Sequence, residues 1–229
     1  MKELIRKLQL FSKMAGKTGK ARGRKSRAQS MVEFAILLPL LIMLFSGMVE
    51  FGFMMNTYLS LLDATRQSAR HYSNLTPFLL NPLTNLIEDD PNFYSGSALE
   101  VKDALAPPAD PNARQIVLDT TRDDVIVSVI SVSVDDATDT ISLIQRHPDG
   151  YVYFSLYGNQ SSNYQLDSNI EALMTQNGTI PVQTGILIVE VWYGYHGVLK
   201  LPWLEMFMSD SSPVMLHADT IMPLVSAKP

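Results

Sequence analysis

The pattern of apolar and polar positions sets one long segment apart from the rest of the chain. Residues 34–55 form a run of 22 residues in which Glu50 is the only charged residue. As an α-helix this run would be about 33 Å long, enough to cross the roughly 30 Å hydrocarbon core of a bilayer. A helix buried in a soluble core usually keeps a polar stripe, and residues 35–45 have none. The pattern therefore predicts a membrane span over about residues 34–55.

Two carboxylates and a proline mark this span. Glu33 and Glu50 are 17 residues apart, about 26 Å along a helix. Each is therefore expected near one membrane–water interface, where a charge costs less than at the bilayer centre. Pro39 removes one backbone hydrogen bond and should kink the helix rather than end it.

Helical periodicity continues beyond the span. Mostly apolar residues recur at spacings of four and three, at Tyr58, Leu62, Thr65, Ala69 and Tyr72. No proline or glycine interrupts residues 53–73. We therefore expect one continuous helix over about residues 29–73, near 67 Å long. Its amphipathic outer half needs a covering surface, either the chain's own domain or another subunit.

The remaining chain predicts an α+β fold. Residues 74–113 are proline-rich and read as irregular, with a short helix started by the capping box Ser97-x-x-Glu100 and stopped by Pro107. Residues 114–229 read as an extracytoplasmic, mainly antiparallel β domain on which the long helix packs. A second capping box, Ser168-x-x-Glu171, predicts another short helix. The expected strands are 124–134, 140–145, 151–157, 184–195 and 214–225, with residues 146–150 as the turn joining the second and third.

Charge is distributed unevenly and predicts topology. Residues 1–30 carry a net charge of +9 and residues 31–229 a net charge of −14, which together give −5. A basic segment directly before a span stays in the cytoplasm, so residues 1–28 read as a cytoplasmic leader and the acidic part as exported. Basic clusters also bind nucleic acid, but this one adjoins a span and lacks interleaved aromatic residues. Membrane lipid with anionic headgroups is the expected partner, and no nucleic acid is expected.

Candidate catalytic chemistry is sparse. The chain has no cysteine, its four histidines show no metal-ligand spacing, and no Gly-x-Ser-x-Gly elbow is present. The acidic pairs Asp89-Asp90 and Asp123-Asp124 and the cluster over residues 135–139 read as solvated turns. We therefore expect no enzyme activity, no metal site and no cofactor.

The segment Arg27-Ala-Gln-Ser-Met-Val-Glu33-Phe-Ala-Ile-Leu-Leu-Pro39 has a distinctive order. A basic leader is followed by a small residue, a Glu-Phe pair and an apolar helix with an early proline. Glu50-Phe-Gly and the run over residues 62–70 continue the pattern. Over residues 27–72 the chain resembles the TadE-like pseudopilins, minor pilins of the tight-adherence (Flp-type) pilus system.

The resemblance implies a role and a set of site residues. A prepilin peptidase would cut between Ala28 and Gln29, although the family usually has glycine at the position of Ala28. Glu33 would become the fifth residue of the mature subunit and serve assembly, and a cut after Gly23 is an alternative. Other implied partners are pilins, pseudopilins and the pilus assembly platform proteins. The implied location is the cytoplasmic membrane, as a single-pass protein, or the pilus fibre.

Two other functions stay open at this point. The first is an unprocessed, single-pass, membrane-anchored protein whose extracytoplasmic domain binds a ligand. The second is an exported enzyme, which the lack of a nucleophile–base or metal constellation disfavours.

Overall fold

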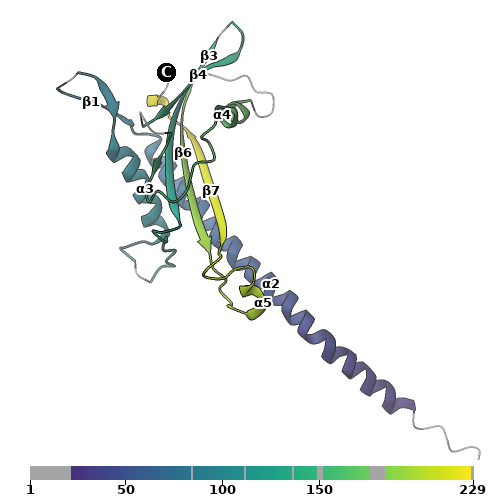
Figure 1. Ribbon diagram of the computed structural model, residues 1–229. Coiled ribbons are helices and arrows are strands. Elements are labelled where there is room, and N and C mark those ends of the chain that lie inside the picture. The colour runs from purple at the N-terminus through teal and green to yellow at the C-terminus, as the bar shows by residue number, and fades with distance from the viewer. Residues whose placement is uncertain are drawn as a thin grey trace, which may run out of the picture. The chain divides into compact units, whose positions relative to one another are not determined.

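The computed structural model describes most of the chain (Figure 1), and side chains are described from residue 30 onward. The chain divides into two units, residues 1–49 and 50–229, and helix α2 (Arg22–Tyr72) contributes to both. Residues 1–21 of the predicted leader lie outside the described residues. The described ranges are 22–83, 85–110, 112–135, 137–148, 152–175 and 184–227.

Helix α2 confirms the predicted long N-terminal helix. It is continuous through Pro39 and ends at Tyr72, close to the predicted end. It begins at Arg22, before the expected start near Gln29. Arginine, lysine and alanine, which make up most of residues 22–28, have good helix propensity, which is consistent with the earlier start.

The second unit contains an antiparallel sheet with strand order β4-β3-β6-β7. The two central strands bury residues on both faces, which explains their nearly continuous valine and isoleucine content. The predicted α+β class is therefore confirmed. The strand bounds are β3 (Asp124–Asp135), β4 (Thr140–His147), β5 (Phe154–Ser155), β6 (Thr184–Tyr195) and β7 (Val214–Pro223).

The predicted strand over residues 151–157 was wrong in length and partner. Within the described part of that range, residues 152–157, only Phe154 and Ser155 form a strand, and they pair with β3 rather than with β4. β3 has 12 residues and β4 has 8. β4 pairs with β3 only from Val129 onward, so the first part of β3 is available to β5. Arg146 and His147 belong to β4 rather than to a turn, and residues 149–150 of the predicted turn lie outside the described residues.

The predicted capping boxes were also wrong. Helix α3 (Pro91–Leu105) begins earlier, with Asp90 as N-cap and proline in the first turn, a favourable start for a helix. Ser97 lies inside α3, where its hydroxyl is 2.9 Å from that of Ser68. Helix α4 (Asp167–Met174) follows Leu166 without a side-chain cap.

Smaller elements complete the described part of the chain. A two-stranded hairpin, which the sequence did not predict, lies in the proline-rich segment, and β7 lies at an edge of the main sheet. The remaining bounds are β1 (Phe78–Leu80), β2 (Ile87–Asp89), α5 (Pro202–Glu205) and the 3-10 helix η2 (Val225–Ala227).

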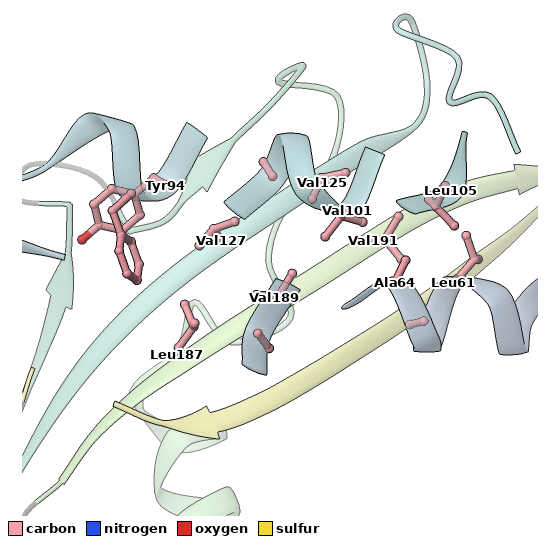
Figure 2. Close-up of a cluster of buried hydrophobic side chains, with 14 of the residues drawn as sticks. Leu61, Ala64, Tyr94, Val101, Leu105, Val125, Val127, Leu187, Val189 and Val191 are labelled. Carbon is pink, nitrogen blue, oxygen red and sulfur yellow. The ribbon is translucent and has the colours of Figure 1, made fainter. Parts of the chain in front are cut away.

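The two faces of the central strands form two separate cores. Odd-numbered residues of β3 and β6 pack with Leu61 and Ala64 of α2 and with Val101 and Leu105 of α3 (Figure 2). Even-numbered residues of the same strands pack with Ile170 of α4. This alternation follows from the two-residue period of a strand. The odd set is Val125, Val127, Val129, Leu187, Val189 and Val191, and the even set is Ile130, Val132, Val134, Ile186 and Ile188.

The outer half of α2 is covered by the chain's own domain, one of the two alternatives open from the sequence. Leu61, Thr65 and Ala69 are fully buried, while the predicted stripe members Tyr58 and Leu62 are partly buried at its border. Thr65 contacts the β7 residue Thr220, with their hydroxyl oxygens 2.9 Å apart. The stripe is therefore present, with its centre rotated slightly from the predicted position.

We predict that Leu61→Ala lowers the free energy of unfolding by about 2–5 kcal/mol, because it leaves a cavity in a well-packed core. Leu59 on the same helix is 52% exposed, so Leu59→Ala is the matched control and should change stability little. Chemical unfolding of the full chain in detergent measures both. Equal losses for the two variants would contradict the packing described here.

Candidate functional site

The first half of α2 exposes an apolar surface. Every described side chain from residue 30 to residue 45 is exposed, including Ile36 at 71% and Phe45 at 68%. Its most apolar 18-residue window has a mean hydropathy of 2.3 and is 6% buried. This segment is therefore not buried in a core of its own chain. By length and composition this helix can cross a membrane, which supports a single-pass, membrane-anchored protein.

For the other site residues predicted in this half of α2, the structure shows their position in the helix but does not test their role. Ala28 and Gln29 lie within α2 by their backbone, and their side chains are outside the described set. Glu33 is exposed. Pro39 lies within an uninterrupted helix. Processing, the assembly role and the kink remain predictions.

Glu50 is placed very differently from Glu33. Its side chain is fully buried, and its carboxylate accepts three hydrogen bonds that we call the Glu50 clamp. The Tyr195 hydroxyl donates to Oε1 at 2.6 Å. The backbone N–H of Val198 donates to Oε1 at 2.7 Å, and that of Leu199 to Oε2 at 2.9 Å. The clamp therefore joins α2 to the end of β6 and the segment after it.

The local sequence explains why this carboxylate is needed. β6 ends at Tyr195, so the next backbone N–H groups have no strand partner and must find another acceptor. Burial and donation to Glu50 both raise the pKa of Tyr195, so its hydroxyl stays protonated and keeps donating. The predicted position of Glu50 at a membrane interface is not tested by these contacts. The sequence does not show the clamp, because its members are about 145 positions apart.

Two further carboxylates were misread as a solvated turn. Asp123 is 2% exposed and Asp124 is fully buried. Asp123 accepts hydrogen bonds from the N–H groups of Asp119 and Gly194, each at 2.8 Å. Asp124 accepts from Ser155 Oγ at 2.6 Å, and from the backbone of the loop after β5. The pair ties three chain segments together and is structural.

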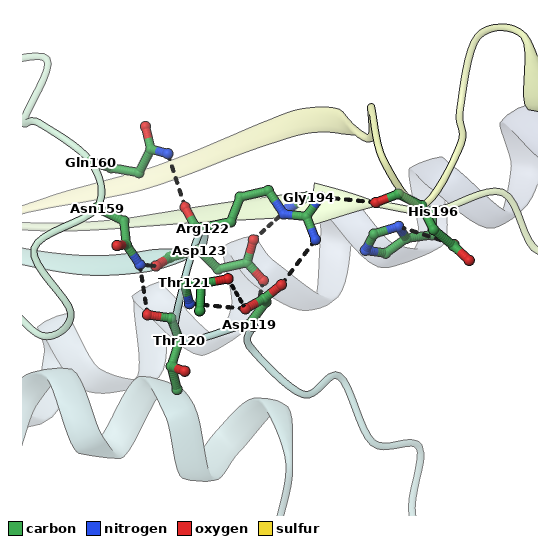
Figure 3. Close-up of polar contacts among 10 residues, drawn as sticks. Asp119, Thr120, Thr121, Arg122, Asp123, Asn159, Gln160, Gly194 and His196 are labelled. Carbon is green, nitrogen blue, oxygen red and sulfur yellow. Dashed lines mark hydrogen bonds and ion pairs between the residues drawn. The ribbon is translucent and has the colours of Figure 1, made fainter.

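The turn before Asp123 supports this arrangement (Figure 3). Asp119 accepts from the N–H and hydroxyl of Thr121, at 2.9 and 2.7 Å, and from the Arg122 guanidinium at 2.9 Å. These contacts lower the pKa of Asp119 to about 2. The side-chain amides of Asn159 and Gln160 donate to backbone carbonyls of the same turn, at 2.9 Å. The turn is therefore held from both sides.

Each of the four histidines lies beside a carboxylate. The nitrogen–oxygen distances are 2.7 Å for His71–Glu100, 3.3 Å for His147–Asp89, 3.4 Å for His196–Asp210 and 3.1 Å for His217–Glu190. Among the described residues, no three His, Asp or Glu side chains are grouped so that they could hold a metal ion. The expectation that the chain has no metal site stays a prediction.

A cavity of about 870 Å³ lies beside the β1–β2 hairpin. Aromatic and aliphatic side chains line it together with the carboxyl groups of Glu88 and Asp89. The Tyr94 hydroxyl donates to Asp89 at 2.9 Å, which fixes one wall. The space is large enough for a small ligand. Its lining includes Ile87, Pro91, Tyr94, Val152 and Phe154.

We predict that Glu50→Ala lowers the free energy of unfolding by about 2–4 kcal/mol, because it leaves one hydroxyl and two N–H groups without their acceptor. Glu33→Ala removes the same group from an exposed position of the same helix and should leave domain stability unchanged. Unfolding of the full chain in detergent, followed by tryptophan fluorescence, compares them. A Glu50→Ala chain as stable as the Glu33→Ala chain would contradict the clamp.

Comparison with known proteins gives one finding that bears on this helix. No curated protein and no solved structure matches the chain. Residues 28–70 match the family model described as TadE-like protein, and this range lies entirely within α2. The chain therefore carries a TadE-like N-terminal segment, and the resemblance seen in its sequence is confirmed over residues 28–70.

Proposed function

We propose that this protein is a minor pilin or pseudopilin subunit for assembly of a tight-adherence type IV pilus, with no catalysis of its own. The observation that carries the proposal is that the TadE-like match and helix α2 coincide. The inner half of that helix exposes apolar side chains, and the outer half is built into a folded domain. Such a chain suits a subunit that is stored in a membrane and assembled through its helix.

Processing and assembly are linked in this proposal. Cleavage by a prepilin peptidase between Ala28 and Gln29 creates an α-ammonium group at Gln29. Glu33 is four residues further along, one helical turn away. Placing a carboxylate near lipid is costly unless a positive group compensates it. The ammonium of a neighbouring subunit can therefore be drawn to Glu33, which would set the axial register between two helices.

The charge distribution supports an orientation. The leader carries the basic residues and would remain in the cytoplasm, so the domain after α2 would face outward from the cytoplasmic membrane. The proposed partners are the prepilin peptidase, other pilins and pseudopilins, and the pilus assembly platform proteins. Membrane lipid surrounds the helix before assembly.

We predict that protein purified from membranes of a cell with a prepilin peptidase starts at Gln29. N-terminal sequencing measures this, and Ala28→Gly is the matched variant, expected to raise the processed fraction because glycine is usual at this position in the family. A chain that is uncut in both forms would overturn the processing step.

We also predict that Glu33→Ala leaves membrane insertion intact but blocks assembly. The variant should stay in the membrane fraction after alkaline extraction and no longer copurify with the other pilins. Ser30→Ala, a change to an exposed residue within one turn of Glu33, serves as control. Normal pili made with Glu33→Ala as the sole copy would end the assembly role.

The second candidate is an unprocessed, membrane-anchored binding protein, which the cavity beside the β1–β2 hairpin favours. The two functions differ in their N-terminus. A mature start at Gln29 supports the pilin class, and an intact leader supports the binding protein.

A further inference from the structure

A loop attached to the Glu50 clamp exposes a group of apolar side chains. It runs from Gly197 to Met208, is closed by a hydrogen bond from Gly197 N–H to the Met208 carbonyl at 3.3 Å, and includes α5. We call it the collar loop. Its exposed apolar side chains are Val198 at 54%, Met206 at 77% and Phe207 at 69%.

We propose that the collar loop is a membrane-surface anchor, whose exposed apolar side chains enter the outer headgroup and acyl-chain boundary of the bilayer that α2 crosses. The proposal rests on the membrane insertion of α2 described under the proposed function. It adds a second contact with lipid, made by a segment far from the span in sequence.

The clamp determines the level of the loop. The N–H groups of Val198 and Leu199 lie 2.7 and 2.9 Å from the Glu50 carboxylate. Glu50 belongs to the last turns of the predicted span, and its neighbour Phe51 is 56% exposed. A loop bonded to this residue is therefore carried to the outer edge of the hydrocarbon core.

The backbone of the collar loop makes most of its hydrogen bonds within the protein. Irregular backbone enters lipid only when its polar groups are satisfied within the protein. The clamp accepts two N–H groups, and α5 supplies internal bonds from Leu204 and Glu205 to the Leu201 carbonyl at 2.8 and 3.0 Å. Two more run from Phe207 and Met208 to the Leu204 carbonyl, at 2.9 and 3.0 Å. Few N–H groups of the loop therefore need water.

The residue types favour lipid over a protein partner. Tryptophan and phenylalanine beside a lysine are typical of segments lying at a membrane interface. Trp203 is half-buried in the loop. The Lys200 ammonium is exposed and lies 3.6 Å from Asp210, so it can also reach a lipid phosphate. The apolar helix of a second subunit is the competing occupant, and the experiment separates it from lipid.

The test uses the full chain, which has no cysteine, in nanodiscs that hold one copy each. An environment-sensitive fluorophore is attached at Phe207→Cys or at Val225→Cys. Val225 is 82% exposed and lies beside Ser226, whose hydroxyl donates to the Leu75 carbonyl just after the end of α2. The end of α2 is about 33 Å along the helix from Glu50. Val225 lies near that end, far from the collar loop, so Val225→Cys serves as the matched control.

We expect the Phe207→Cys label to shift to the blue, to rise several-fold in intensity and to be quenched by nitroxides placed just below the lipid headgroup. The Val225→Cys label should show none of these changes. Trp203 gives a second, label-free measurement in a Trp192→Phe chain, where brominated lipid should quench it.

Three results would overturn the proposal. A water-exposed Phe207→Cys label in nanodiscs that retain the protein would refute the collar contact while α2 insertion stands. A blue shift seen only when several copies share a nanodisc would assign the loop to a subunit contact. Protein that is not retained by nanodiscs at all would refute the membrane insertion on which both proposals depend.

Discussion

The structure depends on helix α2, whose two halves lie in different surroundings. The inner half of α2 exposes apolar side chains, and its outer half buries Leu61, Thr65 and Ala69 against a sheet. The Glu50 carboxylate stands at the start of the second unit, where this change occurs. Three donors from the end of β6 and the following loop converge on it. A charge that would be costly within an apolar helix is thereby converted into an attachment point.

Buried carboxylates serve the same purpose elsewhere in the domain. Asp123 and Asp124 hold the loops around the start of β3. Glu190 accepts from the Asn163 N–H at 3.0 Å and contacts His217 at 3.1 Å. The chain has no cysteine, so these loops are fastened by charge-assisted hydrogen bonds rather than by disulfides. This way of closing loops is consistent with a domain large enough to stand on its own core.

The sequence predicted the features whose signal is local and periodic. The apolar run over residues 34–55 and the alternation in β3 and β6 each repeat over many residues, so helix and strands follow from composition. Features that depend on distant partners were missed. Asp124 resembles any acidic turn residue until the loop after β5 is folded onto it. The start of α3 is a different case, because Asp90 followed by proline is a local helix-start signal that the capping box at Ser97 obscured.

The same distinction between local and distant signals applies to the two carboxylates of α2, Glu33 and Glu50. Glu33 lies on the exposed surface of an apolar helix, and that placement follows from neighbouring residues alone. The burial of Glu50 does not follow from them, because its donors lie about 145 positions away. Only the tertiary fold distinguishes an acid that borders an apolar segment from an acid that anchors a loop.

The two-sided burial of β6 has a consequence for folding fidelity. Its odd positions carry leucine and valine toward α2 and α3, whereas Glu190, at an even position, lies on the opposite face among polar partners. A slip of one residue against β3 would turn that acid into the aliphatic layer, where an ionised carboxylate is strongly disfavoured. Glu190 therefore disfavours a one-residue misalignment of β6 against β3.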